Sequence, residues 1–480
     1  MEIAGRGVVF FGEVGSDRSN ACFPGVCSVP GGRWMVCFRS APKKTDSFPQ
    51  EVLLTWSDDE GAKWADPVEP FSPPVLDGKP GIFRGGYLTP LGGERVLAVL
   101  YWVDASDYSL PFFNEETEGI LPSRLFLALS DDEGRTWSEP WLLDTSPYDM
   151  ETPITGPVLV LPDGEWALQF ETNNSYYDSS VWRHSSVLMF SRDEGQSWPE
   201  HVKVTDDPDA RIFYWDQRPG LLRASNRMPR EPRCASGLMD ARKGDDAVPG
   251  SGTARRPDTA DAGPRRNPEG RGVFGCMPVS RSIGASGLRS RSCFGGVGSD
   301  PLCAVAHAPW PAAKSTPSRP RDILLEAPND GTILDVFWTF DRKEAVYLNI
   351  HARHSKDNGR TWSKLWDLGI PGQPAAPVQA ADGRIVMPYV DRERTPVIKL
   401  RTSSDGGRSW PDDTELILDD SADRPQQVGK SSMQDAWSEM AEFSVGLPQT
   451  ALLPDGDVLV VYYGGPETDH TALRWVRVRP

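Results

Sequence analysis

Acidic side chains, with one arginine and one tyrosine, stand where a series of apolar segments ends. The segments VLAVLYW, WALQF, LDVFWTF and VMPYV each run into an acidic residue, seven to eleven positions after a glycine turn. With two further segments of the same kind, the six positions are Arg39, Asp104, Glu171, Asp341, Asp391 and Tyr463. Carboxyl groups crowded into one site push their pKa values apart, so that one stays protonated while another is ionised. Cleavage of a glycosidic bond needs this arrangement, because one carboxyl acts as an acid beside a second carboxylate.

A second group of polar residues precedes the same turns, where other extended segments begin. In YWDQRP these residues are Asp216, Gln217 and Arg218, and Arg84 takes the matching place earlier in the chain. A guanidinium group binds carboxylates or hydroxyls through paired hydrogen bonds. The predicted catalytic residues are Asp104, Glu171, Asp216 and Asp341. The predicted substrate-binding residues are Arg39, Arg84, Gln217, Arg218, Asp391, Arg392 and Tyr214.

An alternative interpretation gives the same residues structural roles. The neighbouring pairs Asp341–Arg342 and Asp391–Arg392 also suit salt bridges between sheets, or caps at strand ends. The acidic loop PFFNEETEG at 111–119 either covers the site or is an exposed loop. No cofactor and no metal site are predicted.

Five copies of the pattern S-x-D-x-G-x-x-W indicate how these residues are positioned. The copies SDDEGAKW, SDDEGRTW, SRDEGQSW, SKDNGRTW and SSDGGRSW begin at Ser57, Ser130, Ser191, Ser355 and Ser403. Ser and Asp side chains can hydrogen-bond to backbone N–H groups in a turn, Gly takes a positive φ, and Trp packs on the sheet. Each copy follows an extended segment such as EVLLTW or SRLFLAL. We therefore predict that the aspartates of these repeats are structural.

Six glycine-containing turns divide the chain into similar units. They include or end at Gly32, Gly93, Gly164, Gly331, Gly383 and Gly456. Each unit reads as about four strands, so the chain is predicted to be all-β and to form a six-bladed β-propeller. The N-terminal GRGVVFFGE is expected to pair beside the C-terminal ALRWVRVRP and to close the ring. The candidate residues above then meet at one end of the central channel.

Five such repeats on six predicted blades resemble the sialidase (neuraminidase) superfamily, whose members carry Asp-box (BNR) repeats in a six-bladed propeller. The resemblance covers most of the chain. It implies a glycoside hydrolase, and within that class an exo-α-sialidase, with an arginine triad, a tyrosine nucleophile helped by a glutamate, and an aspartate acid/base. The chain departs from that pattern twice. Residues 21–25, ACFPG, hold no arginine, and VGLPQT at 445–450 holds no tyrosine, which leaves Tyr214, Tyr462 and Tyr463 as nearby candidates.

One segment does not fit the repeat spacing. The repeats begin 73, 61, 164 and 48 residues apart, and the excess of the third interval falls between Leu222 and Gly331. Residues 223–321 are rich in Arg, Pro and Gly, and contain 17 Lys and Arg against 8 Asp and Glu. We predict one propeller over 1–480, with 223–321 as a disordered or non-homologous insertion in blade four. A basic interaction arm and a lid over the site are the alternatives.

Composition argues against several classes of protein. The net charge of −17 argues against nucleic-acid binding, and no apolar run reaches the roughly 18 residues of a membrane span. No signal peptide is recognised, which predicts a cytoplasmic location. Seven cysteines without a CxxC pair indicate neither a disulfide framework nor a zinc site. The predicted partner is a carbohydrate substrate. A non-catalytic carbohydrate- or protein-binding propeller and a sugar-acid lyase remain as alternatives, and the oligomeric state stays open.

Overall fold

Nearly all the regular elements are β-strands, because short runs of β-branched and aromatic residues are separated by glycine turns. The computed structural model describes residues 1–45, 49–223, 329–420 and 433–480. These residues form strands β1 to β27, one helix, α1 (Met433–Glu442), and a 3-10 turn at Asp412–Thr414. No helix in these ranges is long and apolar enough to cross a membrane. The predicted all-β class is confirmed.

The strands form five larger sheets and a two-stranded ribbon. The first sheet runs β25 (Val445–Leu452), β26 (Val458–Glu467), β27 (His470–Arg479), β2 (Asn20–Ser28), β3 (Trp34–Ala41) and β4 (Glu51–Ser57), with β1 (Glu2–Phe10) on β27. The second runs β10 (Trp141–Leu142), β9 (Ser123–Ser130), β6 (Arg95–Asp104) and β5 (Gly81–Gly92). The third runs β11 (Leu159–Val160), β12 (Trp166–Glu171), β13 (Ser185–Ser191) and β14 (Glu200–Asp206).

The remaining sheets come from the second half of the chain, apart from β15 and the ribbon. The fourth runs β15 (Ile212–Arg223), β16 (Asn329–Asp341), β18 (Asn349–Ser355) and β19 (Trp366–Pro371), with β17 (Val346–Tyr347) on β16. The fifth runs β20 (Gln373–Pro374), β22 (Ile385–Asp391), β23 (Val397–Ser403) and β24 (Leu416–Asp419), with β21 (Val378–Gln379) on β22. The ribbon pairs β7 (Phe113–Asn114) with β8 (Gly119–Ile120).

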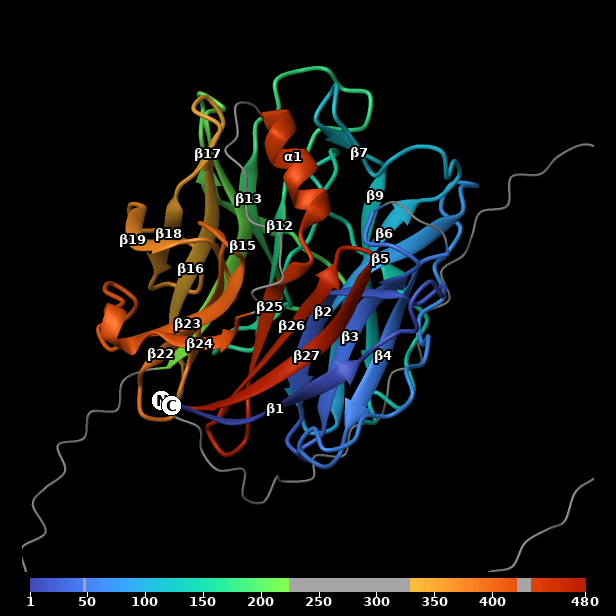
Figure 1. The fold of residues 1–480 in the computed structure, drawn as a ribbon. Helices are drawn as coiled ribbons and strands as arrows, with labels where there is room; N and C mark the ends of the chain where they lie inside the picture. The colour runs from blue at the N-terminus through green and yellow to red at the C-terminus, as the bar shows by residue number, and fades with distance from the viewer. Residues whose placement is uncertain (46–48, 224–328, 421–432) are drawn as a thin grey trace, which may run out of the picture. The chain divides into compact units, whose positions relative to one another are not determined.

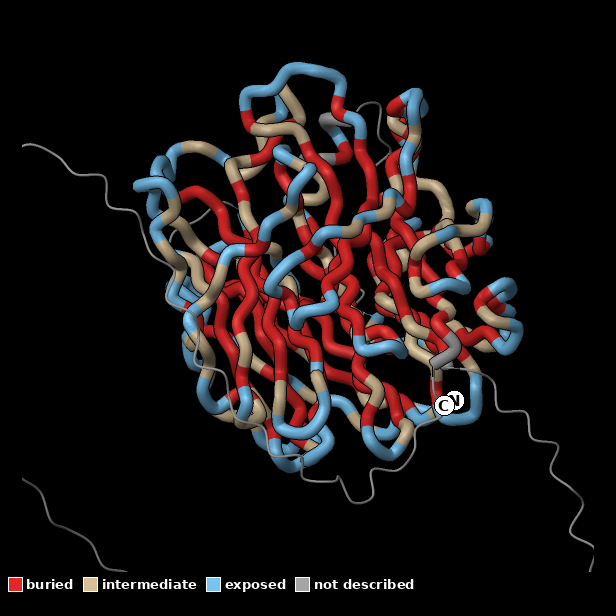
Figure 2. Tube along the Cα trace, turned by 180° about the vertical axis from the view of Figure 1, so that it is seen from behind, coloured by how far each residue is buried: buried red, intermediate tan, exposed pale blue. Residues whose placement is uncertain are grey.

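Hydrophobic clusters fill the spaces between successive sheets and arrange the sheets in a ring. Val52 and Leu100 belong to the cluster between the first and second sheets, and Val99 and Leu168 to that between the second and third. Similar clusters join the third sheet to the fourth, the fourth to the fifth, and the fifth back to the first. Figure 2 shows the buried strands inside and the exposed turns at their ends. This closed series of sheets is the predicted β-propeller.

The first sheet has seven strands because the two ends of the chain meet in it. Strand β1 pairs antiparallel with β27, beginning with Glu2 opposite Arg479, and Figure 1 shows the two termini together. A single parallel bridge between Asn20 and Thr471 joins β27 to β2. The predicted closure of the ring by the N-terminal segment is confirmed, while the number of six blades stays a prediction.

The five repeats form turns that follow the third strand of a blade-like group. In the first repeat, Ser57 Oγ accepts a hydrogen bond from the Gly61 N–H at 2.8 Å, and Asp59 Oδ1 accepts one from the Lys63 N–H at 2.8 Å. The same two bonds recur in the repeats that begin at Ser130, Ser191, Ser355 and Ser403. These serines and aspartates are therefore used inside their own turns, and none of them lines the cavity described below.

Residues 224–328 lie outside the described part of the chain, so the predicted character of the insertion at 223–321 stays a prediction. The strands on either side of it, β15 and β16, form one hairpin in which Leu222 faces Thr332 and Arg223 faces Asn329. The two ends of the segment are therefore neighbours on paired strands. This is the attachment that an insertion within one blade requires.

Candidate active site

A cavity of about 450 Å³ is bounded by the starts of innermost strands, by helix α1 and by the β7–β8 ribbon. Its polar and charged lining residues are Lys44, Thr45, Arg84, Glu115, Thr155, Glu171, Asn173, Asp216, Gln373, Arg392 and Tyr463. Its aromatic rings are those of Phe23, Phe112, Phe113, Trp182, Trp215, Trp338 and Phe443. Such a lining fits a small ligand with polar groups and an apolar face. Among the described residues, no group of three or more His, Cys, Asp or Glu side chains could hold a metal ion.

Irregular innermost strands direct side chains into this cavity. A bulge in β15 places Asp216 and Gln217 opposite a single residue of β16, and Asp216 has a φ of 48°. The same bulge in β2 and β25 gives Phe23 and Leu447 φ values of 54° and 45°. A bulge redirects side chains, and a positive φ is strained for residues other than glycine. Asp216 is thus the acidic member of a repeated feature that elsewhere holds apolar residues.

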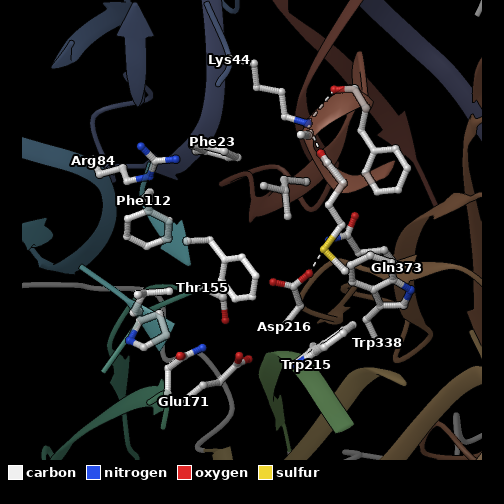
Figure 3. Close-up of a pocket in the computed structure, with 18 of the residues that line it drawn as sticks. Phe23, Lys44, Arg84, Phe112, Thr155, Glu171, Trp215, Asp216, Trp338 and Gln373 are labelled. Atoms are coloured by element: carbon white, nitrogen blue, oxygen red, sulfur yellow. Dashed lines mark hydrogen bonds between the residues drawn. The ribbon is translucent and has the colours of Figure 1, made fainter. Parts of the chain in front are cut away.

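The Asp216 carboxyl points into the cavity (Figure 3). Gln373 Nε2 donates a hydrogen bond to Asp216 Oδ2, and Arg218 Nη2 lies 3.7 Å from Asp216 Oδ1. Burial raises the pKa of Asp216, and the negative charge of Glu171 raises it further, whereas Arg218 lowers it. Asp216 can therefore keep its proton at a pH at which an exposed aspartate is ionised.

Glu171 ends strand β12 and is held beside Asp216. Its Oε1 accepts a hydrogen bond from the Gln217 N–H at 2.9 Å, and its Oε2 lies 3.3 Å from His184 Nε2. Because Gln217 directly follows Asp216 in the bulge, this bond connects the two acidic residues through one peptide unit. Glu171 and Asp216 are the two predicted catalytic residues that the structure brings together in the cavity.

Two of the predicted arginines also line the cavity. The Arg84 guanidinium lies 4.2 Å from the centre of the Phe112 ring. Arg392 Nη2 donates hydrogen bonds to Gln373 Oε1 at 2.8 Å and to the Val445 carbonyl at 3.1 Å. Both positive charges thus lie in the same cavity as the two carboxyl groups, as the predicted substrate-binding role requires.

Lys44 is a cavity residue that the sequence patterns did not predict. Its Nζ donates hydrogen bonds of 2.7 and 2.8 Å to the carbonyl oxygens of Met440 and Phe443, at the end of helix α1 (Figure 3). Burial lowers the pKa of Lys44 to about 7, and the charge of Arg392 adds to this effect. The sequence shows only that Lys44 follows a strand that ends at Ala41. Its hydrogen-bond partner, the Met440 carbonyl, lies 396 positions further along the chain, so no local pattern could have revealed the contact.

Three predicted acidic residues lie outside the cavity and form ion pairs. The pairs are Asp104–Lys79 at 2.7 Å, Asp341–Arg211 at 2.6 Å and Asp391–Lys399 at 2.8 Å. The hydrogen bonds from Arg211 lower the pKa of Asp341, which opposes a role as a proton donor. These contacts match the structural interpretation of strand-end carboxylates, although their partners are not the adjacent Arg342 and Arg392.

Arg39 and Tyr214 also lie outside the cavity. The buried Arg39 guanidinium donates a hydrogen bond to the Gln50 side chain at 2.7 Å and further bonds to backbone carbonyls of the segment after β3. The Tyr214 ring packs against Phe337 and His351. Side chains at neighbouring positions of a strand point to opposite faces. An error of one position in a predicted strand end therefore selects a core residue in place of a cavity residue.

Gln217 and Arg218 are fully buried behind Asp216 and do not line the cavity. Gln217 Nε2 donates a hydrogen bond of 2.6 Å to Asp335 Oδ2. Among the described residues, none accepts a hydrogen bond from the three guanidinium nitrogens of Arg218. Arg218 therefore acts on Asp216 through its charge, and the predicted direct contact of both residues with substrate is not available in this structure.

The acidic loop at 111–119 contributes to the cavity, as one of its two predicted alternatives requires. Phe112 and Glu115 line the cavity beside the β7–β8 ribbon. Thr117 Oγ1 donates a hydrogen bond of 2.7 Å to the Tyr176 carbonyl, which ties this loop to the one after β12. Two loops from different sheets thus form one wall.

No model of a known protein family matches the chain, and no curated protein matches it either. The identification of the repeats as Asp boxes therefore stays a prediction. The fold nevertheless matches solved structures over nearly the whole chain. A protein of unknown function from Dyadobacter fermentans has a TM-score of 0.56 at 14% identity, with 100% of this chain and 99% of that chain covered.

Two sialidase structures are similar to the same extent. The NanB sialidase from Streptococcus pneumoniae has a TM-score of 0.52 at 10% identity, with 98% of this chain and 70% of that chain covered. The intramolecular trans-sialidase from Ruminococcus gnavus has a TM-score of 0.53 at 12% identity, with 98% and 96% covered. The chain therefore has a sialidase-like fold, and at these identities the similarity concerns the fold alone.

Proposed function

Starting from this sialidase-like propeller, we propose that the chain is a glycoside hydrolase whose acid is Asp216 and whose second carboxylate is Glu171. The observation that carries the proposal is their arrangement. The backbone N–H next to Asp216 holds Glu171 at 2.9 Å, and both side chains line one cavity with aromatic walls. Glycoside hydrolysis uses two carboxyl groups in different protonation states on either side of the bond.

The surroundings of the two groups suit different roles. Burial raises the pKa of Asp216, so it can donate a proton to the leaving oxygen of the glycosidic bond. Glu171 is held by the Gln217 N–H and lies close to His184, which orients its carboxylate toward a positive charge that develops on the sugar ring. The nearby rings of Trp215 and Trp338 offer apolar faces to a bound sugar.

A narrower proposal is that the substrate carries a carboxylate, as the substrate of an exo-α-sialidase does. Arg84, Arg392 and Lys44 place three basic groups in the cavity, which favours an anionic sugar. Tyr463 lines the cavity, but burial raises its pKa, which favours a neutral hydrogen-bonding phenol over a nucleophile. In this proposal Glu171 is the nucleophile, a role that a tyrosine has in the sialidase superfamily.

Hydrolysis of an aryl α-sialoside, alongside neutral and uronic aryl glycosides, tests both proposals. Release from the sialoside supports the narrower one, and release from another glycoside alone supports only the general one. An ultraviolet-absorbing unsaturated product from a uronic substrate would indicate a lyase. Binding without turnover of any substrate would indicate a carbohydrate-binding propeller.

Single substitutions then test the two carboxyl groups. We expect Asp216→Asn and Glu171→Gln each to lower kcat by about 10²- to 10⁴-fold, because each removes a group that acts in the transition state. The exposed residues Asp209 and Glu139 provide matched controls as Asp209→Asn and Glu139→Gln. Since the pKa of Asp216 is raised, the alkaline fall of kcat/KM of the wild type should lie above the usual carboxyl range. Full activity of either cavity variant would remove that residue from the mechanism.

A further inference from the structure

We propose that Gln373 is a positioning residue that determines which carboxyl oxygen of Asp216 carries the proton. The inference rests on the proposed function, because Asp216 is there the acid. It concerns a contact between two described side chains, however, and can be measured with or without turnover.

Arg392 determines the orientation of the Gln373 amide. Its Nη2 lies 2.8 Å from Gln373 Oε1, and because a guanidinium has only donors, the atom that faces it must be the amide oxygen. The amide Nε2 then faces Asp216 Oδ2 and donates to it. Arg392 is itself held by the Val445 carbonyl and by the Phe443 ring, 3.7 Å from the guanidinium carbon. Gln373 and Arg392 are only 4% and 3% exposed, so this arrangement is fixed by packing.

The orientation of Gln373 decides where the proton of Asp216 can lie. Oδ2 accepts this hydrogen bond, and in a protonated carboxyl the carbonyl oxygen is a stronger acceptor than the hydroxyl oxygen, so the bond favours a proton on the other oxygen. The proton therefore belongs on Oδ1, and Figure 3 shows one carboxyl oxygen turned toward Gln373 and the other turned away. Arg218 Nη2, 3.7 Å from Oδ1, is too far away to donate a hydrogen bond to it, and a guanidinium cannot accept this proton. It is left for an acceptor in the cavity, such as a glycosidic oxygen.

Other charged groups act on Asp216 from separate elements. Glu171 faces it from β12, Arg218 from β15, and Arg392 from the end of β22. Burial raises the pKa values of the nearby phenols Tyr87, Tyr347 and Tyr463, and the negative charge of Asp216 in turn raises them further. Among these described groups, Gln373 is the one that donates a hydrogen bond to the carboxyl. Removing its amide therefore removes the hydrogen bond to Asp216 and the acceptor of Arg392, and leaves the charges in place.

The pH dependence of kcat/KM separates positioning from simple structural support. Gln373→Met keeps the length of the side chain but loses the donor that favours the carboxylate. We expect its alkaline limb to move up by about one pH unit, because the ionised form loses a hydrogen bond. We expect kcat to fall by about 10-fold with KM within about 3-fold, because the proton is no longer confined to one oxygen. Gln373→Glu, which keeps an acceptor for Arg392 but sets a second carboxyl against Asp216, should move the limb further.

An infrared titration gives a readout that does not need turnover. The carbonyl band of protonated Asp216 is identified by its absence in Asp216→Asn, and its pH midpoint is compared in the wild type, in Gln373→Met and in the exposed control Gln196→Met. An upward shift in Gln373→Met alone supports the inference. An unchanged midpoint, or an equal shift in the control, overturns it. If no glycoside is cleaved, the proposed function fails while this titration still decides the role of Gln373. If Gln373→Met does not fold, Gln373→Glu takes its place in the same comparison.

Discussion

Asp216 and Glu171 lie in one cavity but are held by different kinds of partner. Asp216 stands at a strained position with a φ of 48° and faces a side-chain amide. Glu171 stands at a regular strand end and accepts a hydrogen bond from a backbone N–H. A backbone N–H is fixed by the sheet, whereas a side-chain amide can be replaced by substitution. A single substitution of the amide partner can therefore change the pKa of Asp216, whereas no substitution other than proline removes the backbone donor of Glu171.

Asp335 lies behind these groups and is fully buried. Burial raises its pKa to about 8 from an ordinary 3.8, although a hydrogen bond from Gln217 acts in the opposite direction. Within that window the folded protein keeps a proton that the unfolded chain has released, so stability falls as the pH rises. We expect Asp335→Asn, which resembles the protonated form, to remove up to about 1.4 kcal/mol of this dependence per pH unit.

Urea unfolding at pH 5 and pH 8 measures the contribution of Asp335. The loss of unfolding free energy between the two pH values should be smaller in Asp335→Asn than in the wild type. Asp209→Asn, at an exposed position, should leave the loss unchanged. The same loss in all three proteins would show that Asp335 is not protonated in the folded state.

At the scale of elements, the repeated turns pack against side chains of neighbouring strands. In the first turn, Gly61 has a φ of 84°, and a Cβ there would lie 2.7 Å from the Trp475 ring and 2.8 Å from the Trp34 ring. These two rings meet edge to face, with centroids 5.3 Å apart, and belong to the cluster between β27 and β3. The glycine is therefore needed both for its backbone conformation and for its size.

We expect Gly61→Ala to lower the free energy of unfolding by about 2 to 4 kcal/mol, from backbone strain and overpacking together. Gly15→Ala is a matched control, because Gly15 has a φ of 76° and a Cβ there would meet no atom of a non-adjacent described residue within 4 Å. It should cost about 1 to 2 kcal/mol from strain alone. Urea unfolding of both variants separates the two effects, and equal losses would rule out the contact with the tryptophans.

At the scale of the whole molecule, closure of the ring depends on chain segments that are far apart in sequence. Strand β1 pairs with β27, and hydrophobic clusters join each sheet to the next. The described sheets thus form a closed series in which Arg223 and Asn329 face each other on one hairpin. A short turn between these two residues is therefore long enough to complete the ring.

We expect a shortened chain, in which an Asn-Gly turn replaces residues 224–328, to fold with the melting temperature of the full chain. The reason is that the turn would join residues that are already paired. Its kcat/KM on any glycoside that the full chain cleaves should be unchanged. Loss of solubility, of melting temperature or of turnover would assign the segment a role in folding or activity.

The strands and the turn glycines follow from the sequence by itself. The patterns behind them act over a few residues: apolar runs between turns, glycine at positive φ, and Ser and Asp side chains bonded within their own turn. The same reasoning selected Glu171, Asp216, Arg84 and Arg392, and all four line the cavity.

Only the tertiary structure decided which of the strand-end residues share that cavity. Asp341 follows the same local pattern as Glu171 but pairs with Arg211 instead. A bulge turns Asp216 inward, and Lys44 enters the site because the end of helix α1 supplies its partners. Charges and hydrogen bonds act through space between elements that the chain connects over long distances. A local pattern can therefore predict where a strand ends, but it does not predict which side chains from other elements contact the residue at that end.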